Sequence, residues 1–140
     1  MKNPANSTLL WLIEAGHLTR HALVAPLTER GLEVGDDAVL FALTDAAGIL
    51  DTQLCEVTGI EHDALITRLD RLAAHDIVER AAIGSTRRPG TRLTEKGVAL
   101  RNGLAADWYT LEERLVGDLK PRRRKALKKA LKMLLDRLER

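Results

Sequence analysis

Two adjacent arginines, Arg87 and Arg88, lie in a loop whose composition should leave them exposed. Residues 84–90 read GSTRRPG, and glycine, serine and proline are common in turns. A guanidinium group at the tip of such a loop can enter the minor groove of DNA where the groove is narrow and its potential is most negative. The alternative is an ordinary solvated loop. We expect these arginines to bind nucleic acid.

A pair of helices is predicted shortly before this loop. The segment QLCEVTG forms a short helix that ends at Gly59, because glycine tolerates the positive φ of a helix C-cap. In the next helix, Leu65, Leu69 and Leu72 recur at helical spacing and form an apolar stripe. Away from the stripe lie small or charged residues that a DNA major groove can accept: Asp63, Ala64, Thr67, Arg68, Asp70 and Arg71. A DNA-binding helix–turn–helix and an ordinary helical hairpin both fit this pattern.

The remaining chemically reactive residues are weaker candidates. His17 and His21 lie four residues apart and could chelate a metal, but no third ligand can be located, so packing is the alternative. Cys55 has no basic cluster near it that would activate its thiol, which favours a small buried residue over a redox sensor. The sequence contains no nucleophile elbow, phosphate loop, paired carboxylates or Cys/His cluster. We therefore expect neither an enzyme nor a bound cofactor or metal.

Length and composition indicate one helical domain. The chain has 140 residues, of which 45% are hydrophobic and only 3% aromatic, and its many leucines and alanines favour helices. Its apolar runs are far shorter than the roughly 20 residues that span a bilayer, and its N-terminus lacks a signal-peptide pattern. A single cysteine cannot form an internal disulfide, which fits a reducing compartment. We expect a cytoplasmic protein that does not contact a membrane.

Positive charge is concentrated at the C-terminus. Residues 120–140 carry 10 basic and 2 acidic side chains, a net charge of +8, whereas residues 1–119 carry 12 and 18, a net charge of −6. Because phosphate binding needs concentrated positive charge, the acidic helix with Asp63 and Asp70 argues against DNA binding, and the arginine loop argues for it. The run KPRRRKALKKALK at residues 120–132 could contact flanking DNA or an acidic partner. It could instead solvate the outer face of a dimer helix.

The elements before the helix pair, and the strands around the arginine loop, are predicted from apolar periodicity and from residues that begin or end helices. Pro26 should kink or divide the first helix, because it lacks an amide donor. Asp51 is a plausible N-cap for the segment QLCEVTG. Helices are predicted at residues 9–30 and 34–47, a short strand at 48–50, and the two strands around the arginine loop at 77–83 and 91–93.

Two further helices are predicted at the C-terminal end. Thr94 is a good N-cap for a long helix that runs to about residue 119, and Pro121 suits the first position of a final helix. An apolar stripe runs along this last helix through Leu127, Leu131, Leu134 and Leu138. The helix at residues 9–30 also carries an apolar seam. Together, these apolar surfaces on the first and last helices exceed what one small domain can bury. We therefore expect a dimer that forms through the terminal helices.

The order of these motifs resembles the multiple-antibiotic-resistance regulator (MarR) family. The resemblance rests on ITRLDRLAAHDIVER, on the basic hairpin with TRR, and on LTEKG followed by a long helix, and it extends from about residue 31 to the C-terminus. It implies a mainly α fold with a small β-hairpin wing, in a single domain of residues 1–140. Within it, residues 34–97 would form a winged helix–turn–helix lobe that binds DNA, and residues 9–33 and 98–140 would be dimerisation helices. The implied function is transcription regulation by a homodimer, most simply a repressor of a near-palindromic operator, released by a small-molecule effector.

The resemblance also implies which residues bind DNA and effector. The implied DNA-binding residues are Asp63, Ala64, Thr67, Arg68, Arg71, Arg87, Arg88 and Arg92. The family binds small effectors in a crevice between its first, second and long fifth helices, for which the candidates are Trp11, His17, His21, Phe41, Trp108 and Tyr109. This chain departs from the family at Thr86, where the family usually has an aspartate that pins a wing arginine. It also has its recognition-helix arginine one position later, at Arg68 instead of Thr67. Arg71 could be a structural ion-pair residue.

Other classes of function also fit the sequence. The acidic second helix and the altered wing would suit a winged-helix module that binds proteins through its dimer surface and basic tail, without specific DNA binding. Non-specific compaction of DNA by the C-terminal cations is a third possibility. Replacing Arg87 and Arg88 separates the first two classes, because a regulator would lose operator affinity and an interaction module would keep its partner.

Overall fold

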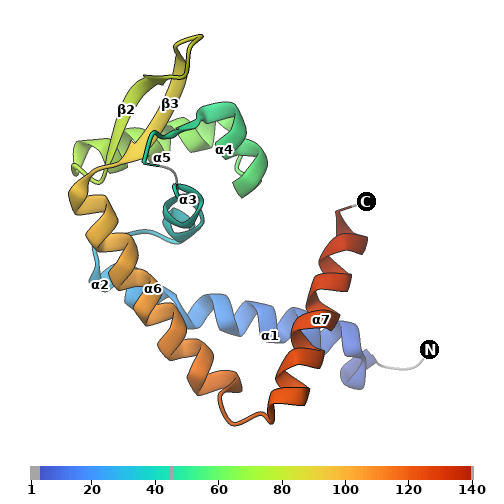
Figure 1. Cartoon of the computed structure of the whole chain (residues 1–140). Coiled ribbons are helices and arrows are strands. Elements are labelled where there is room, and N and C mark those ends of the chain that lie inside the picture. Colours follow the sequence, from blue (N-terminus) through green and yellow to red (C-terminus); the bar gives the residue numbers. More distant parts are fainter. Residues whose placement is uncertain (1–3, 45, 140) are drawn as a thin grey trace. The chain divides into compact units, whose positions relative to one another are not determined.

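The computed structural model describes residues 4–44 and 46–139, which are mainly helical with one small sheet (Figure 1). In chain order the elements are a short 3₁₀ helix η1 (Pro4–Asn6), α1 (Thr8–Ala22), α2 (Val24–Glu29), α3 (Asp36–Ala42), β1 (Ile49–Leu50), α4 (Asp51–Thr58), α5 (His62–Ala74), β2 (Val78–Ile83), β3 (Arg88–Leu93), α6 (Glu95–Val116) and α7 (Pro121–Leu138). The chain forms two compact units, residues 1–105 and 106–140. The predicted fold, helical with a small β-hairpin, is confirmed.

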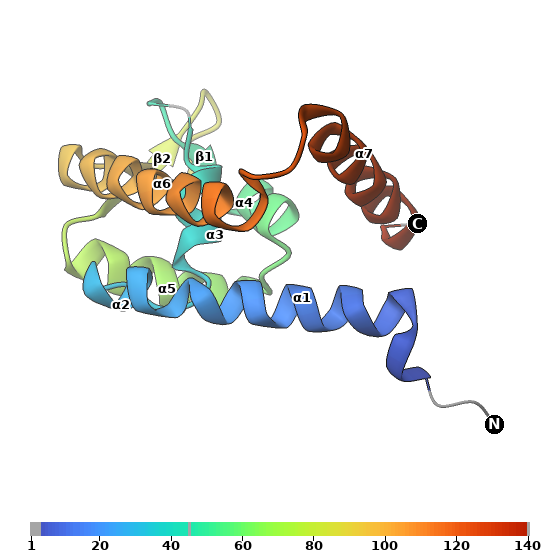
Figure 2. The ribbon, with the colours of Figure 1, turned by 90° about the horizontal axis from the view of Figure 1, so that it is seen from below.

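The core of the first unit is built largely from leucines of α3, α4 and α5. Leu40, Leu54, Leu65, Leu69 and Leu72 are fully buried, and burial of one such side chain contributes about 1.5–3 kcal/mol. The apolar stripe predicted for the second helix of the pair is therefore its core face. These three helices lie together in both Figure 1 and Figure 2, and α5 also contacts β2.

The turn between α4 and α5 depends on a glycine, as predicted. Gly59 is the C-cap of α4 and has a φ of 72°, in the left-handed region that only glycine adopts without strain. Its N–H donates to the Cys55 carbonyl at 2.9 Å. The chain can therefore reverse within a few residues and start α5 at His62.

The sheet is antiparallel, with strand order β1-β3-β2. The short strand predicted at residues 48–50 is found as β1 (Ile49–Leu50), and it joins the hairpin by pairing with β3. The strand predicted at residues 91–93 is too short, because the turn ends at Arg87 and leaves Arg88 paired with Ile83. Gly90 fits a crowded position in β3, since a Cβ there would lie 2.1 Å from Ile83 Cγ1.

The first predicted helix is divided. α1 ends at Ala22 and α2 begins at Val24, with Leu23 as the cap residue of both. Pro26 accounts for a break at this point, because it has no N–H to donate to the Ala22 carbonyl and its ring crowds that oxygen. Of the two outcomes predicted for Pro26, a kink or a division, the division is found.

The helix predicted at residues 34–47 is shorter in the structure. Gly35 precedes α3 with a φ of 100°, a left-handed conformation that cannot continue a helix from its N-terminal side. The helix ends at Ala42, after which Leu43 leaves the helical region. Asp45, which fell within the predicted helix, lies outside the described residues.

The predicted N-cap of α4 is wrong. Leu50 occupies that position, and its N–H donates to Gln53 Oε1 at 3.2 Å. Asp51 is the first residue of α4, and its buried carboxylate contacts the hairpin instead.

The long helix α6 begins where predicted. Thr94 Oγ1 accepts the Gly97 N–H at 3.0 Å, so the predicted N-cap is confirmed. A Cβ at Gly97 would lie only 2.0 Å from the Ile77 carbonyl oxygen, which shows how closely the start of α6 approaches the backbone before β2. The helix ends at Val116, short of the predicted residue 119.

The second unit contains the C-terminal part of α6 and the whole of α7. Pro121 is the first residue of α7, as predicted. Arg124 forms ion pairs with Glu112 at 3.4 Å and Glu113 at 2.8 Å. The hydrogen bond to Glu113 is the main cause that raises the pKa of Arg124. These contacts link α7 to the end of α6.

Large apolar side chains are exposed on the terminal helices. They are Leu9, Leu10, Trp11, Ile13 and Leu18 on α1, and Leu127, Leu131, Met133, Leu135 and Leu138 on α7. Neither helix contains a buried residue. No helix among the described residues is long and apolar enough to cross a membrane.

Candidate nucleic-acid interface

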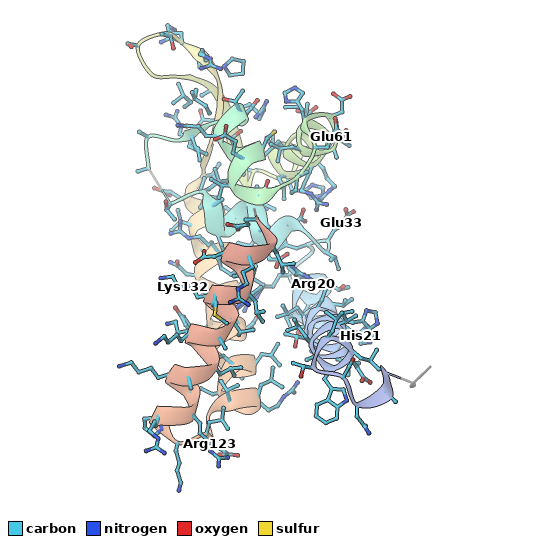
Figure 3. All side chains as sticks on the ribbon, turned by 90° about the vertical axis from the view of Figure 1, so that its right-hand side faces the viewer. Arg20, His21, Glu33, Glu61, Arg123 and Lys132 are labelled. Carbon is cyan, nitrogen blue, oxygen red and sulfur yellow. The ribbon has the colours of Figure 1, made fainter. Side chains whose placement is uncertain are left out.

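The exposed face at the start of α5 is polar and acidic. Glu61 caps the helix, because its carboxylate oxygens accept the N–H groups of Asp63 at 3.2 Å and Ala64 at 3.3 Å. The Thr67 hydroxyl donates to the Asp63 carbonyl at 3.1 Å. Asp63, Ala64 and Thr67 are all exposed. Figure 3 shows Glu61 at the start of the helix. The first three predicted DNA-binding residues therefore share one accessible surface.

Two other predicted DNA-binding residues, Arg68 and Arg71, are held by a single buried carboxylate on α3. Arg68 Nη1 donates to Asp36 Oδ1 at 2.6 Å, and Arg71 Nη2 donates to the same oxygen. The other oxygen accepts the Glu33 N–H at 2.7 Å. Because Asp36 is 0% exposed, its charge is tolerated only when paired and hydrogen-bonded in this way. The arginines thus fix α5 against α3, which is the structural role considered for Arg71.

A second buried carboxylate joins α1 to the same place. Asp37 is 1% exposed, and its Oδ2 accepts a hydrogen bond from Arg20 Nη1 at 2.7 Å. Its Oδ1 accepts the Gly35 N–H at 3.1 Å. The start of α3 therefore anchors α1 through Asp37 and α5 through Asp36; Figure 3 shows Arg20 on α1 and Glu33 before α3.

The paired arginines of the hairpin lie exposed at its tip, as predicted. Arg87 has a φ of 52° and donates its N–H to the Gly84 carbonyl at 3.2 Å, which closes the turn. Neither Arg87 nor Arg88 forms an ion pair with any residue that the structure describes. An open hollow of about 360 Å³ beside the tip is lined by Arg80, Ala81, Ala82, Arg87, Pro89 and Gly90. Two unpaired guanidinium groups are therefore available to a polyanion.

The base of the hairpin is fixed by an ion pair to α4. Arg80 donates from Nη1 and Nη2 to the two oxygens of Asp51, each at 2.7 Å, and also to Thr91 Oγ1. The hydrogen bonds to Asp51 raise the pKa of Arg80 further above its usual range. This fork-shaped contact fixes geometry as well as charge. The wing strands are therefore anchored from below, although Thr86 cannot supply the carboxylate that the family uses near the tip.

Arg92, the eighth predicted DNA-binding residue, is paired across the hairpin. Its Nε donates to Glu79 Oε2 at 3.0 Å, and the two residues are register partners in β2 and β3. The hydrogen bond, followed by the opposite charge, lowers the pKa of Glu79 and raises that of Arg92. Most of the positive charge of Arg92 is thus offset within the wing.

The predicted effector residues come from both compact units. Trp11, His17 and His21 are exposed on α1, and Figure 3 shows His21 pointing away from the helix. Trp11 Nε1 donates to the Ala5 carbonyl at 3.2 Å. Phe41 lies on α3, half-buried, whereas Trp108 and Tyr109 belong to the second unit. The predicted effector crevice therefore stays a prediction.

The sequence also offered Cys55 and a histidine pair as candidate sites. Cys55 is half-buried on α4, and no group of three or more potential metal ligands occurs in the part of the chain that the structure describes. The sequence did not predict that three buried carboxylates, Asp36, Asp37 and Asp51, form ion pairs with arginines. Only the fold shows that arginines 17 to 35 positions away in the sequence reach these carboxylates.

Comparison with known proteins gives this geometry a context. No family model and no curated protein matches the chain. A MarR family transcriptional regulator from Silicibacter pomeroyi DSS-3 is 26% identical, with a TM-score of 0.79 over 99% of both chains. AbsC, a MarR family transcriptional regulator from Streptomyces coelicolor, is 24% identical, with a TM-score of 0.84 over 99% of this chain and 97% of its own. CouR from Rhodococcus jostii RHA1, solved with bound p-coumaroyl-CoA, is 19% identical, with a TM-score of 0.84 over 96% and 95%.

These similarities extend over nearly the whole chain and include every part that the sequence motifs implied. The α4–α5 pair, the three-stranded sheet with its basic hairpin, and the long helix after LTEKG all occur in the expected order. The chain is similar over nearly its whole length to MarR family transcriptional regulators, and it has their winged helix–turn–helix fold.

Proposed function

We propose that the protein is a DNA-binding transcriptional regulator that acts as a homodimer and represses transcription from a near-palindromic operator. The observation that carries the proposal is the wing: two exposed, unpaired arginines at the tip of a hairpin whose base is fixed by the Asp51–Arg80 pair. Beside it, α5 has a buried leucine face and an exposed polar face. A rigid helix next to a basic hairpin is an arrangement suited to one major groove and the adjacent minor groove.

In this proposal the residues of α5 divide into two groups. Asp63 can accept a hydrogen bond from the cytosine N4 amino group, the Ala64 methyl can contact thymine, and the Thr67 hydroxyl suits several bases. Arg68 and Arg71 act mainly as positioning residues, because Asp36 accepts a hydrogen bond from each of them. The helix itself then contributes little electrostatic attraction for DNA phosphates, so the wing must provide most of that attraction.

The wing supplies the positive charge. We propose that Arg87 and Arg88 enter the minor groove that flanks each half-site, where the narrow groove focuses negative potential. Arg92 lies further from the tip and shares its charge with Glu79, so its contribution is smaller.

Dimerisation would bury the exposed apolar residues of α1 and α7. Trp11 and Ile13 are 59% and 60% exposed, and Leu135 and Leu138 are 57% and 76% exposed. Apolar patches of this kind on a small protein mark an interface. A two-fold axis between subunits would present two α5 helices to half-sites about one helical turn apart.

Release by a small molecule is the final part of the proposal. CouR, which shares the fold, was solved with p-coumaroyl-CoA bound, so a protein of this architecture can hold an organic ligand. The aromatic and histidine residues predicted for the effector crevice, Trp11, His17, His21, Phe41, Trp108 and Tyr109, are the side chains we propose for such a site.

The test replaces both wing arginines. Binding of Arg87→Ala/Arg88→Ala to the DNA upstream of its own coding sequence should weaken by about 100-fold or more, because each lost base or groove contact costs about 1–3 kcal/mol. A lysine pair at the same positions should recover only part of the affinity, since it keeps the charge and loses the planar fork. The matched control is Arg114→Ala, an exposed arginine of α6, which should bind like the parent protein.

Two results would contradict the proposal. If the parent protein does not distinguish its upstream DNA from a scrambled duplex at physiological salt, specific operator binding is excluded. If it does distinguish them and the double alanine variant binds as tightly as the parent, the wing is not the contact that we propose.

A further inference from the structure

One side of α7 carries a row of cationic side chains that form no ion pairs with the described residues. Residues 121–138 contain eight basic side chains and one acidic side chain, a net charge of +7. Five of the cations, Arg122, Lys125, Lys128, Lys129 and Lys132, recur at intervals of three and four residues and so lie along one side of the helix. We call these five residues the α7 lysine face. At a rise of about 1.5 Å per residue, the row extends over about 15 Å.

These charges are not used within the chain. All five side chains are exposed, and none forms an ion pair with a residue that the structure describes. Four arginines of the first unit differ, because Arg68, Arg71, Arg80 and Arg92 are each paired with a carboxylate. Even on α7, the one cation that turns toward α6, Arg124, is paired. Figure 3 marks Arg123 near the start of α7 and Lys132 further along it.

The leucines of α7 lie on its other side. Leu127, Leu131, Leu134 and Leu138 follow one another at intervals of three and four residues, which places them on a stripe separate from the lysine face. The proposed dimer would bury this stripe. The lysine face would then stay in solvent, where a partner would be recognised mainly through charge.

We propose that the α7 lysine face is a second, sequence-independent surface for double-stranded DNA. It would bind the phosphate backbone of a duplex segment other than the one that α5 and the wing read. A duplex presents one negative charge per about 1.7 Å of its axis, so a 15 Å row of lysines can neutralise several phosphates at once. The proposal extends the proposed function, but binding of DNA by α7 does not depend on operator recognition.

DNA fits this surface better than a membrane does. Helices that lie on lipid place tryptophan, phenylalanine or leucine in the acyl region, and α7 has no aromatic residue. The leucine stripe is also the part of the helix that the proposed dimer would remove from solvent. Lysines are flexible, strongly hydrated point charges, which suits phosphates at many positions and does not specify one base sequence.

The test neutralises four lysines in the full-length protein. Lysine and glutamine have similar helix propensity, so Lys125→Gln/Lys128→Gln/Lys129→Gln/Lys132→Gln should keep the fold, which circular dichroism and thermal unfolding would check. The rescue variant has arginine at the same four positions and keeps the charge. Binding to a scrambled duplex and to the upstream DNA would be measured across a salt series, with anionic phospholipid vesicles as a third probe.

We expect the glutamine variant to bind the scrambled duplex at least 10-fold more weakly at low salt. The slope of log affinity against log salt should fall in magnitude by about 3 to 4 for each α7 helix that contacts DNA. Its preference for upstream DNA over the scrambled duplex should persist, and the arginine variant should bind like the parent.

Two results would overturn this proposal. One is a glutamine variant that keeps the parent's affinity and salt slope on the scrambled duplex. The other is a variant that loses only vesicle binding, which would assign the face to lipid. Failure of the proposed function gives a different pattern, because upstream and scrambled DNA would then bind equally in the parent protein, whatever the glutamine variant does.

Discussion

At the scale of single residues, Asp36 is the point on which the orientation of α5 depends. One oxygen of this buried carboxylate accepts hydrogen bonds from two arginines, and the other accepts a backbone N–H. Removing the charge would leave Arg68, whose Nε is already buried without a hydrogen-bond partner among the described residues, facing a neutral group. The loss of one partner from a buried ion pair is far costlier than the loss of a surface pair.

We predict that Asp36→Asn lowers the free energy of unfolding by about 3 kcal/mol, because it leaves two partly buried arginines without their counter-charge. Urea unfolding measures the effect. The matched control is Asp63→Asn on the exposed face of α5, which should change stability by less than about 1 kcal/mol. Equal stabilities of the two variants would show that the Asp36 contacts contribute nothing.

The pair of Glu79 and Arg92 gives a pH-dependent prediction. Because Arg92 lowers the pKa of Glu79 below its ordinary value of 4.5, the folded state binds the Glu79 proton less tightly than the unfolded state does. The stabilisation is therefore complete above the unfolded pKa and is lost as the pH falls through the folded pKa.

We expect Glu79→Gln to be slightly less stable than the parent at pH 7 and equal to it well below pH 4.5. Both side chains are exposed, so the difference at pH 7 is small. Chemical unfolding of both proteins at the two pH values measures it. A deficit that is unchanged at acidic pH would mean that the Glu79 charge is not the cause.

At the scale of elements, the hairpin and the start of α6 are tightly packed against each other. Gly97 allows the first turn of α6 to approach the Ile77 carbonyl, where a Cβ would lie at 2.0 Å. The neighbour is backbone and not a flexible side chain, so the approach can be relieved only by moving the helix or the segment before β2.

We predict that Gly97→Ala lowers the free energy of unfolding by about 1–3 kcal/mol, the usual cost of overpacking. The control is Gly16→Ala in α1, where a Cβ would meet no atom within 4 Å. That change should raise stability by up to about 1 kcal/mol through helix propensity. Thermal unfolding of both variants tests the contrast, and a Gly97 variant as stable as the parent would contradict it.

The elements that could be predicted from the sequence are those fixed by local rules. Gly59, Thr94 and Pro121 occupy the cap or first-turn positions expected of them, since each role depends on the backbone within a few residues. The length of β3 depends on its pairing with β2, and the role of Asp51 depends on Arg80, 29 residues away. Such partners meet only in the folded chain, so composition and spacing cannot identify them.

The residues of the candidate site were likewise predictable only where their surroundings in the sequence determine their role. Exposure of Arg87 and Arg88 follows from the turn formers around them and was predictable. For Arg68 and Arg71, the sequence shows charged residues away from the leucine stripe of a helix, but it does not show the carboxylate of α3 that holds them. A charged residue on the outward side of a helix is therefore a weaker indication of DNA contact than one on a turn.

At the scale of the whole molecule, the exposed leucines of α7 determine whether the proposed dimer forms. We predict that Leu127→Gln/Leu131→Gln shifts the protein from dimer to monomer, because it replaces apolar residues by polar ones in the middle of the proposed interface. Sedimentation equilibrium measures the mass. Operator affinity should fall with it, since each monomer reads only one half-site.

The control for this prediction is Val57→Gln on α4, which also removes an exposed apolar residue, 67% accessible, but outside the terminal helices. It should leave the mass unchanged. A leucine variant that keeps the parent's mass would place the subunit contact elsewhere.

The separation of charge along the chain also bears on how the protein behaves in concentrated solution. The net charge of +2 is the sum of a charge of +8 on residues 120–140 and a charge of −6 on residues 1–119. Molecules of this kind attract one another when ions are scarce, because the cationic end of one meets the anionic part of another, and dissolved salt weakens that attraction over a Debye length of about 10 Å at 0.1 M. The protein is therefore expected to be less soluble in dilute buffer than in saline, and a crowded solution would favour transient clusters that dissolve as ionic strength rises.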